Sequence, residues 1–191
     1  FNSLQFLLFL PAVLVLYFAT PQRWRWALLL AASYYFYACW KVEYLVLILL
    51  STGVDFVVAQ KMAAEPAGPK RKRWLWWSLA TNLGLLFAFK YFNFFNDSTR
   101  AVLERFDITW GLPAFDVLLP VGISFYTFQT LAYTVDVYRG RIEPERHLGR
   151  FALYVAFFPQ LVAGPIERAS RLLPQFREKV EFDYDRLGSG L

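Results

Sequence analysis

The sequence has 191 residues, of which 57% are hydrophobic and 20% aromatic, and its mean hydropathy is +0.34. Charged residues make up 18%, against about 25% in a typical soluble domain. This composition excludes an ordinary soluble domain, and it makes the net charge of +5 a signal of membrane topology rather than of nucleic-acid binding. The single Cys39 excludes an intrachain disulfide.

Six apolar blocks follow one another along the chain, and we expect each to be helical. A helix needs about 20 residues to cross a hydrocarbon core of about 30 Å, so several blocks require tilt or local thinning of the bilayer. The sequence therefore predicts an all-α fold, a polytopic transmembrane helical bundle. The blocks are Leu4–Thr20, Trp26–Trp40, Val42–Ala59, Trp74–Phe95, Val117–Val135 and Phe151–Ile166.

Basic residues gather in alternate loops and predict the orientation of the bundle. The loop with Arg23 and Arg25, the loop Lys61–Arg73 and the loop Arg139–Arg150 hold eleven basic residues, against three in the other loops. The positive-inside rule places these three loops in the cytoplasm. The N-terminus and the loop Asn96–Asp116 are then expected outside.

The fifth block carries polar side chains on two neighbouring helix faces. Tyr126, Gln129, Tyr133 and Asp136 share one face by their spacing, and Ser124, Thr127, Thr130 and Thr134 share the next. Such a helix lies inside a bundle or beside a wet cavity, and the pattern leaves both roles open.

Two acids in these blocks also call for partners. Asp136 and Arg139 lie three residues apart at the end of the fifth block and are expected to pair. Asp55 lies deeper in its block than any other acid, which makes it a functional candidate. A structural pairing with a basic group on a neighbouring helix is the alternative.

The sixth block is short and breaks the pattern of alternating sides. It is interrupted by Pro159, is closed by Gly164–Pro165, and is followed by a tail as basic as the inside loops. Non-helical backbone at membrane depth is tolerated only inside protein or beside water. We predict a re-entrant segment that turns at Gly164–Pro165 and leaves on the cytoplasmic side, with Glu167 and Arg168 held by protein. The alternative is a short span with a proline kink.

No complete catalytic motif occurs in the sequence. It contains no Walker-type loop, no HExxH and no cysteine cluster, so no metal site is expected. His147 is the sole histidine and stands in the polar loop "EPERHLGR", which indicates a solvated residue rather than a catalytic base. We expect the chain to be a piece of a longer protein, nearly complete at its N-terminus and open at its C-terminus.

Three segments resemble signature sequences of a known family. "LLPVGISFYTFQ", "DVYRG" and "FFPQLVAGPIERA" are similar to motifs of the membrane-bound O-acyltransferases, in the bacterial branch that includes alginate O-acetyltransferase. "FNSLQFLLFLPAVLVLYF", "ASYYFYACW" and "FKYFNFF" also fit that branch. The resemblance covers nearly the whole chain in order.

The resemblance implies a multi-pass enzyme of the bacterial inner membrane that moves an acyl group, usually acetyl, onto hydroxyls of a cell-envelope polysaccharide. Residues 1–191 would be the N-terminal part of a single membrane-embedded domain. The family's essential histidine would lie beyond Leu191, so no catalytic residue is assigned here. The implied donor is acetyl-CoA or another acyl carrier, with no bound cofactor. The implied partners are lipids, the donor, and the polysaccharide or a periplasmic acyltransferase, but no nucleic acid.

Channel-wall or scaffold roles are expected at nine positions. Rival interpretations are a transporter or flippase for a small polar or lipid-linked substrate, and a non-catalytic membrane scaffold for envelope enzymes. The nine residues are Gln129, Asp136, Tyr138, Arg139, Gln160, Gly164, Pro165, Glu167 and Arg168.

Overall fold

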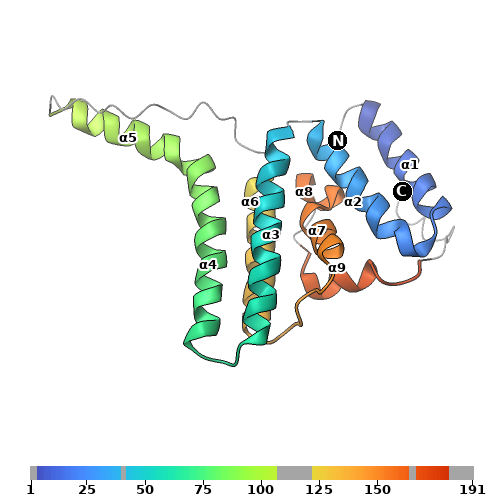
Figure 1. Ribbon diagram of the computed structural model, residues 1–191. Coiled ribbons are helices and arrows are strands. Elements are labelled where there is room, and N and C mark those ends of the chain that lie inside the picture. Colours follow the sequence, from blue (N-terminus) through green and yellow to red (C-terminus); the bar gives the residue numbers. More distant parts are fainter. Residues whose placement is uncertain (1–3, 40–41, 107–121, 164–166, 181–191) are drawn as a thin grey trace.

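The computed structural model describes residues 4–39, 42–106, 122–163 and 167–180, and this part of the chain is helical apart from short connections (Figure 1). The described residues form no strand, which confirms the all-α prediction. The helices are α1 (Leu4–Ala19), α2 (Gln22–Ala38), α3 (Val42–Ala64), α4 (Pro69–Leu86), a π-helical turn (Phe87–Tyr91), α5 (Phe92–Glu104), α6 (Ile123–Tyr138), α7 (Leu148–Ala156), α8 (Phe158–Ala163) and α9 (Ala169–Gln175).

The helices form two packed groups that meet at α3. Helices α3, α4 and α6 pack against one another, and α2 packs against α7, α8 and α3, with α1 on its outer side (Figure 1). The shared core contains large fully buried side chains such as Ile48, Tyr126, Tyr133 and Phe151. The predicted polar helix α6 is therefore an interior helix.

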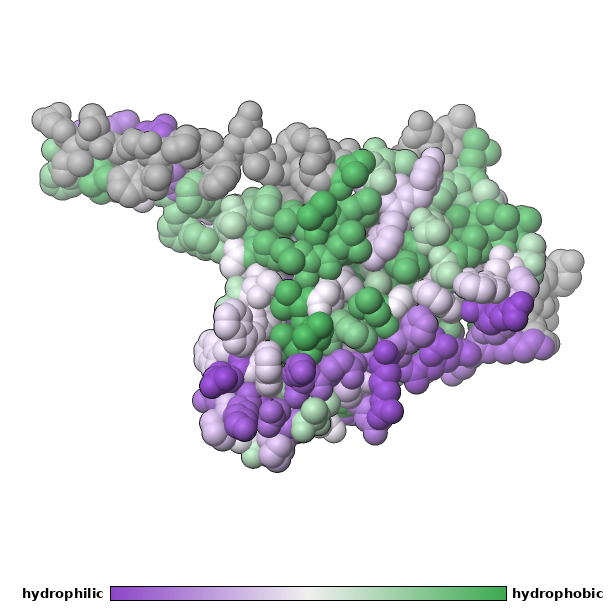
Figure 2. Space-filling view, viewed as in Figure 1, coloured by the Kyte–Doolittle hydropathy of each residue, from purple (hydrophilic) through white to green (hydrophobic). Residues whose placement is uncertain are grey.

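Hydrophilic and hydrophobic residues separate along the bundle. Figure 2 shows the hydrophilic surface at the lower end, where α3 joins α4, and a hydrophobic surface above it. Leu45–Ala64 in α3 is the one stretch of the described chain that is long and apolar enough by itself to cross a membrane, and Phe6–Ala19 is a shorter apolar stretch. We call the lower end the basic end, because it carries the first turns of α2 and α4, with Arg25 and Lys70–Arg73, and the segment Arg139–Arg150 that follows α6.

A buried hydrogen-bonded cluster joins α3, α4 and α6. Asp55 is fully buried, and its Oδ1 accepts a hydrogen bond of 2.5 Å from Ser78 Oγ. Asn82 Nδ2 donates to both carboxylate oxygens at 2.9 Å. Asn82 Oδ1 in turn accepts from Ser51 at 2.8 Å and from Thr130 at 3.2 Å. We call these five residues the Asp55 cluster, and its polar side chains, rather than a basic group, are the partners of the buried acid.

The fourth apolar block does not end in a loop as predicted. The expected loop Asn96–Asp116 is helical as far as Glu104, because α5 continues from the π-helical turn. Apolar residues recur at helical spacing beyond Phe95, which sustains the helix through a stretch with several polar residues. The rest of that loop and the start of the block Val117–Val135 lie outside the described residues.

The sixth block is divided into two helices by a break just before Pro159. Helix α7 ends at Ala156, Phe157 is extended with φ −58° and ψ 107°, and Pro159 stands in the first turn of α8. Proline is tolerated in a first turn but disrupts helix at the preceding residues. The break is therefore at Phe157 instead of at Pro159.

The described chain returns to the basic end after α8. Phe158 N–H donates to Ser33 Oγ of α2 at 3.3 Å, and Ser33 lies about 16 Å along α2 from Gln22 at about 1.5 Å per residue. Helix α9 packs against α7 near the basic end (Figure 1). The predicted turn residues Gly164 and Pro165 lie outside the described residues.

We predict that Asp55→Leu lowers the thermal stability of the full-length protein in detergent. The substitution leaves Asn82 Nδ2 and Ser78 Oγ without their carboxylate acceptor, and a buried unsatisfied polar group costs about 1–3 kcal/mol. Asp97→Leu, at an exposed aspartate, is the matched control and should change the melting temperature little. The double variant Asp55→Leu/Asn82→Leu should recover part of the loss. A melting temperature for Asp55→Leu equal to that of the control contradicts a stabilising role.

Candidate functional site

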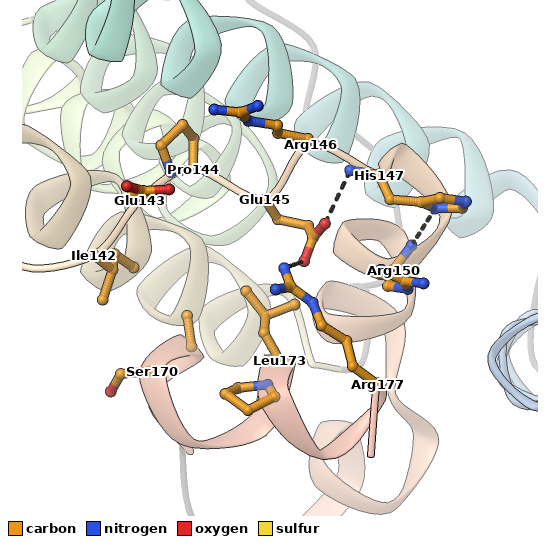
Figure 3. Close-up of a pocket in the computed structure, with 12 residues that line it drawn as sticks. Ile142, Glu143, Pro144, Glu145, Arg146, His147, Arg150, Ser170, Leu173 and Arg177 are labelled. Carbon is orange, nitrogen blue, oxygen red and sulfur yellow. Dashed lines mark hydrogen bonds and ion pairs between the residues drawn. The ribbon is translucent and has the colours of Figure 1, made fainter. Parts of the chain in front are cut away.

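A cavity of about 670 Å³ opens at the basic end, between the loop that follows α6, the start of α7, and α9 (Figure 3). We call it the basic-end cavity. Its charged lining consists of three arginines and two glutamates, together with one histidine. The lining residues used below are Glu143, Glu145, Arg146, His147, Arg150, Ser170 and Arg177.

The loop that forms one wall begins at a tight helix end. Gly140 has a φ of 69°, a left-handed conformation that glycine adopts without strain. Its N–H donates to Val137 O, and Arg141 N–H donates to Asp136 O at 2.9 Å. These two bonds form a Schellman motif, which ends α6 and reverses the chain. The motif "DVYRG" therefore corresponds to a helix terminus that directs the loop into the cavity wall.

Glu145 is the centre of the loop's hydrogen bonds. It is 2% exposed; its N–H donates to Tyr133 Oη at 3.0 Å, and its carbonyl accepts from Gln60 at 2.7 Å. Its carboxylate accepts from His147 N–H at 2.9 Å and forms an ion pair with Arg177 beyond α9 (Figure 3). Glu145 thus joins α3, α6 and the segment after α9.

The ion pair also sets the charge state of Glu145. Burial raises the pKa of the Glu145 carboxyl, but the hydrogen bonds from Arg177 and from His147 N–H outweigh burial, and the pKa lies below its usual value. Glu145 is therefore an ionised carboxylate whose hydrogen bonds and ion pair hold the loop in place. It is unsuited to act as a general base at neutral pH.

His147 begins α7 rather than forming part of a catalytic pair. Its Nδ1 accepts a hydrogen bond of 3.3 Å from Arg150 N–H, as a helix N-cap does, and the side chain is exposed as the sequence predicts. The edge of its ring packs against Trp26 of α2, with ring centroids 4.6 Å apart. Trp26 also fills the space beside Gly149, where a Cβ would lie 2.2 Å from the indole. His147 is thus held at the junction of α2 and α7.

Gln129 and Gln160, both expected in a channel wall, meet in the interior. Gln129 Nε2 donates to Gln160 Oε1 at 3.1 Å and to the carbonyl of Tyr154 at 3.0 Å. Both glutamines are buried, and they link α6 to α7 and α8. The sequence identified both residues, but their pairing depends on the fold.

Asp136 pairs with Arg141 and not, as predicted, with Arg139. The distance from Arg141 Nη1 to Asp136 Oδ1 is 3.4 Å, because the turn at Gly140 brings Arg141 back toward the helix. Arg139 is the exposed C-cap of α6. Tyr138 is half-buried at the last position of α6, with the Arg71 guanidinium 5.8 Å from its ring centroid.

The remaining predicted residues lie before α9. Glu167 is half-buried, and Arg168 is exposed at the N-cap position of α9, directly before the cavity-lining residues Ala169 and Ser170. Gly164 and Pro165 lie outside the described residues. Glu145 and Arg177 were not identified as site residues from the sequence. Glu145 is one of several charged residues in a polar loop, and nothing in the sequence indicates that Arg177 reaches it.

The basic-end cavity is lined by several charged side chains, but the residues lining it do not form a nucleophile–base pair. Its rim carries Arg146 and Arg150, whose guanidinium groups suit anionic partners. Within the described chain no group of three His, Cys, Asp or Glu residues is placed to hold a metal ion.

We predict that Glu145→Gln lowers the melting temperature of the full-length protein at pH 7, whereas Glu143→Gln, at an exposed carboxylate lining the same cavity, does not. Hydrogen bonds to charged groups contribute about 1.5–3 kcal/mol. Since the pKa of Glu145 is lowered in the fold, its stabilisation is present above the unfolded value of about 4.3 and is lost as pH falls through the folded value. Melting curves should therefore converge at acidic pH. A constant difference between wild type and Glu145→Gln across this range contradicts the account.

Comparison with known proteins gives matches over most of the chain. The "Probable alginate O-acetylase AlgI" of Pseudomonas putida is 44% identical over 94% of this chain and 37% of its own length. The protein of the same name from Azotobacter vinelandii is 41% identical over 94% of this chain and 36% of its own. The "Peptidoglycan O-acetyltransferase" of Helicobacter pylori is 33% identical over 83% of this chain and 33% of its own.

The chain spans about a third of the length of these relatives. No family model matches it, and no solved structure matches it. The chain is similar to alginate O-acetylases over nearly its whole length, in agreement with the resemblance of its three motifs to the membrane-bound O-acyltransferases.

Proposed function

We propose that the protein is a membrane-bound O-acyltransferase that transfers an acetyl group to hydroxyls of a cell-envelope polysaccharide such as alginate. The observation that carries this proposal is the similarity to alginate O-acetylases over 94% of the chain. The further similarity to a peptidoglycan O-acetyltransferase supports an envelope polymer as the acceptor class.

The proposed setting is a multi-pass bundle in the bacterial inner membrane, with the N-terminus outside and the basic end in the cytoplasm. The apolar length of α3 and the separation of hydrophilic and hydrophobic surface in Figure 2 support it. Trp24, Trp76 and Trp77 are exposed near the basic end, where aromatic rings favour the membrane interface.

We infer that α7 and α8 form the re-entrant segment. The chain enters from the basic end beside Glu145, reaches the depth of Ser33, and is back at the basic end by α9. At the break, Phe158 N–H donates to Ser33 Oγ and the Phe157 carbonyl accepts from Gln160 N–H, which supplies the partners that irregular backbone at membrane depth requires. Gln129 would hold this segment through its bonds to Tyr154 and Gln160.

The acyl donor, acetyl-CoA or another acyl carrier, would approach the basic end. The arginines at the rim of the basic-end cavity and exposed Arg168 give that end the charge that a phosphate-bearing donor needs. The residues paired within the bundle would be scaffold, and the acceptor would be the polysaccharide itself or a periplasmic acyltransferase partner.

We predict that deletion of the gene in its source organism removes O-acetyl groups from one envelope polysaccharide, and that the full-length protein restores them. Acetate released by mild base and the acetyl resonances in proton NMR measure the effect. Unchanged acetylation of every envelope polysaccharide contradicts the proposed function.

The same complementation assay tests His147. His147→Asn keeps an acceptor that can cap α7, so it should restore acetylation to near the wild-type level. Loss of acetylation in this variant at normal protein abundance would assign His147 a chemical role that its geometry does not suggest.

A further inference from the structure

Helix α5 leaves the bundle at the end opposite the basic end. Figure 1 shows it running across the direction of α4 and away from the other helices. Its packing within the described chain is concentrated on the π-helical turn from which it emerges. A helix of 13 residues that projects in this way does not obtain its stability from the core of the bundle.

The change of direction coincides with the length needed to cross a bilayer. Helix α4 and the π-helical turn together run from Pro69 to Tyr91, the same number of residues as the 23 of α3. At about 1.5 Å per residue this is about 34 Å, slightly more than a hydrocarbon core of about 30 Å. The chain that starts at the basic end has therefore reached the opposite interface when α5 begins.

The surface of α5 is divided into two stripes. The apolar stripe consists of Phe92, Phe95, Val102 and Leu103, spaced i, i+3, i+10 and i+11, and is continued by Phe106 in the turn that follows the helix. Three of these side chains remain exposed: Phe95 by 51%, Val102 by 55% and Phe106 by 70%. Phe94, which is 65% exposed, lies between the two stripes by its spacing, but the other large apolar side chains share one face, which indicates an apolar partner.

A polar stripe lies on the opposite face, formed by Asp97, Arg100 and Glu104. In Figure 2 the hydrophobic atoms of this arm lie along its lower edge, on the side of the bundle's hydrophobic surface, and hydrophilic atoms lie along its upper edge. Such an amphipathic helix matches the plane of a lipid interface, with one face among acyl chains and one in water.

The apolar stripe is continuous with the surface of α4. The rings of Phe87 and Phe95 have centroids 5.5 Å apart, and Phe87 is itself 48% exposed at the corner. The apolar stripe of α5 thus continues the outward-facing apolar surface of α4 past the change of direction at the π-helical turn. Lys90 reaches Ser124 of α6 at 3.3 Å, which keeps its charge beside a polar group at this level.

We propose that α5 lies in the outer interface of the membrane, with its apolar stripe inserted among lipid acyl chains. The inference rests on the proposed function only in that α3 and α4 cross the bilayer. An interfacial helix joined directly to α4 fixes the depth of that span, because sliding of α4 would draw apolar rings into water or polar side chains into lipid.

Spin labels on single cysteines test the proposal in the full-length protein. In a background with Cys39 and every other native cysteine replaced by serine, cysteines replace Phe95, Val102 or Phe106 on the apolar stripe and Asp97 or Glu104 on the polar stripe. The labelled proteins are reconstituted in vesicles of phosphatidylethanolamine and phosphatidylglycerol. Power saturation then compares collisions with oxygen, which concentrates in lipid, and with a water-soluble nickel chelate. We expect oxygen to dominate at the apolar stripe and the nickel chelate to dominate at the polar stripe.

The other possible accessibility results distinguish between the reasons for which the proposal could fail. Low accessibility to both reagents at the apolar stripe would mean that protein covers it, and strong nickel collisions there would mean that it faces water; either result overturns the proposal. Leu50→Cys, on an exposed position of α3, is the control for the span. If Leu50→Cys also reports water, the membrane span has failed and the inference fails with it. If Leu50→Cys reports lipid, a failure at α5 concerns α5 alone. Val102→Cys is a small change that keeps the test valid if a phenylalanine variant misfolds.

Discussion

The hydrogen bonds of the Asp55 cluster hold α3, α4 and α6 in one arrangement, and the placement of the other helices depends on it. In the proposed membrane setting, lipid is as apolar as the side chains it would replace, so apolar contact alone gives little preference for one helix pairing over another. Asp55 and Asn82 instead require specific partners, and each finds them on a neighbouring helix. A shifted register would leave a carboxyl and an amide buried without bonds.

Helix α6 connects the Asp55 cluster to the other helices. On one side Thr130 joins the Asp55 cluster, and on another Gln129 holds α7 and α8 through Tyr154 and Gln160. At the end of α6, the turn at Gly140 places Glu145 beside Arg177. The resulting ion pair holds the segment after α9 at the basic end. Interior polar contacts thus connect the packing of α3, α4 and α6 to the structure of the basic end.

Sequence reasoning identified the features that depend on local pattern. Apolar length predicted the helices, and the polar faces of α6 predicted its burial, which Thr130 and Gln129 confirm. It did not identify features set by tertiary neighbours or by competition between local signals. Asp55 was predicted as a functional candidate, with pairing to a basic group as the alternative, and its partners are instead the neutral side chains of Ser78 and Asn82. The polar run after Phe95 was interpreted as a loop, although apolar spacing continues the helix to Glu104.

Labelling from one side of the membrane tests the central claim, that the chain crosses the bilayer with its basic end inside and that α7 and α8 return to that end. Single cysteines at the exposed positions Lys70, Ser170 and Glu104 of the full-length protein are treated with a membrane-impermeant maleimide, with Cys39 and every other native cysteine replaced by serine. The account predicts that Glu104→Cys reacts in spheroplasts, and that Lys70→Cys and Ser170→Cys react only after permeabilisation. Reaction of Ser170→Cys in sealed spheroplasts would show that the segment crosses the membrane and would contradict the account.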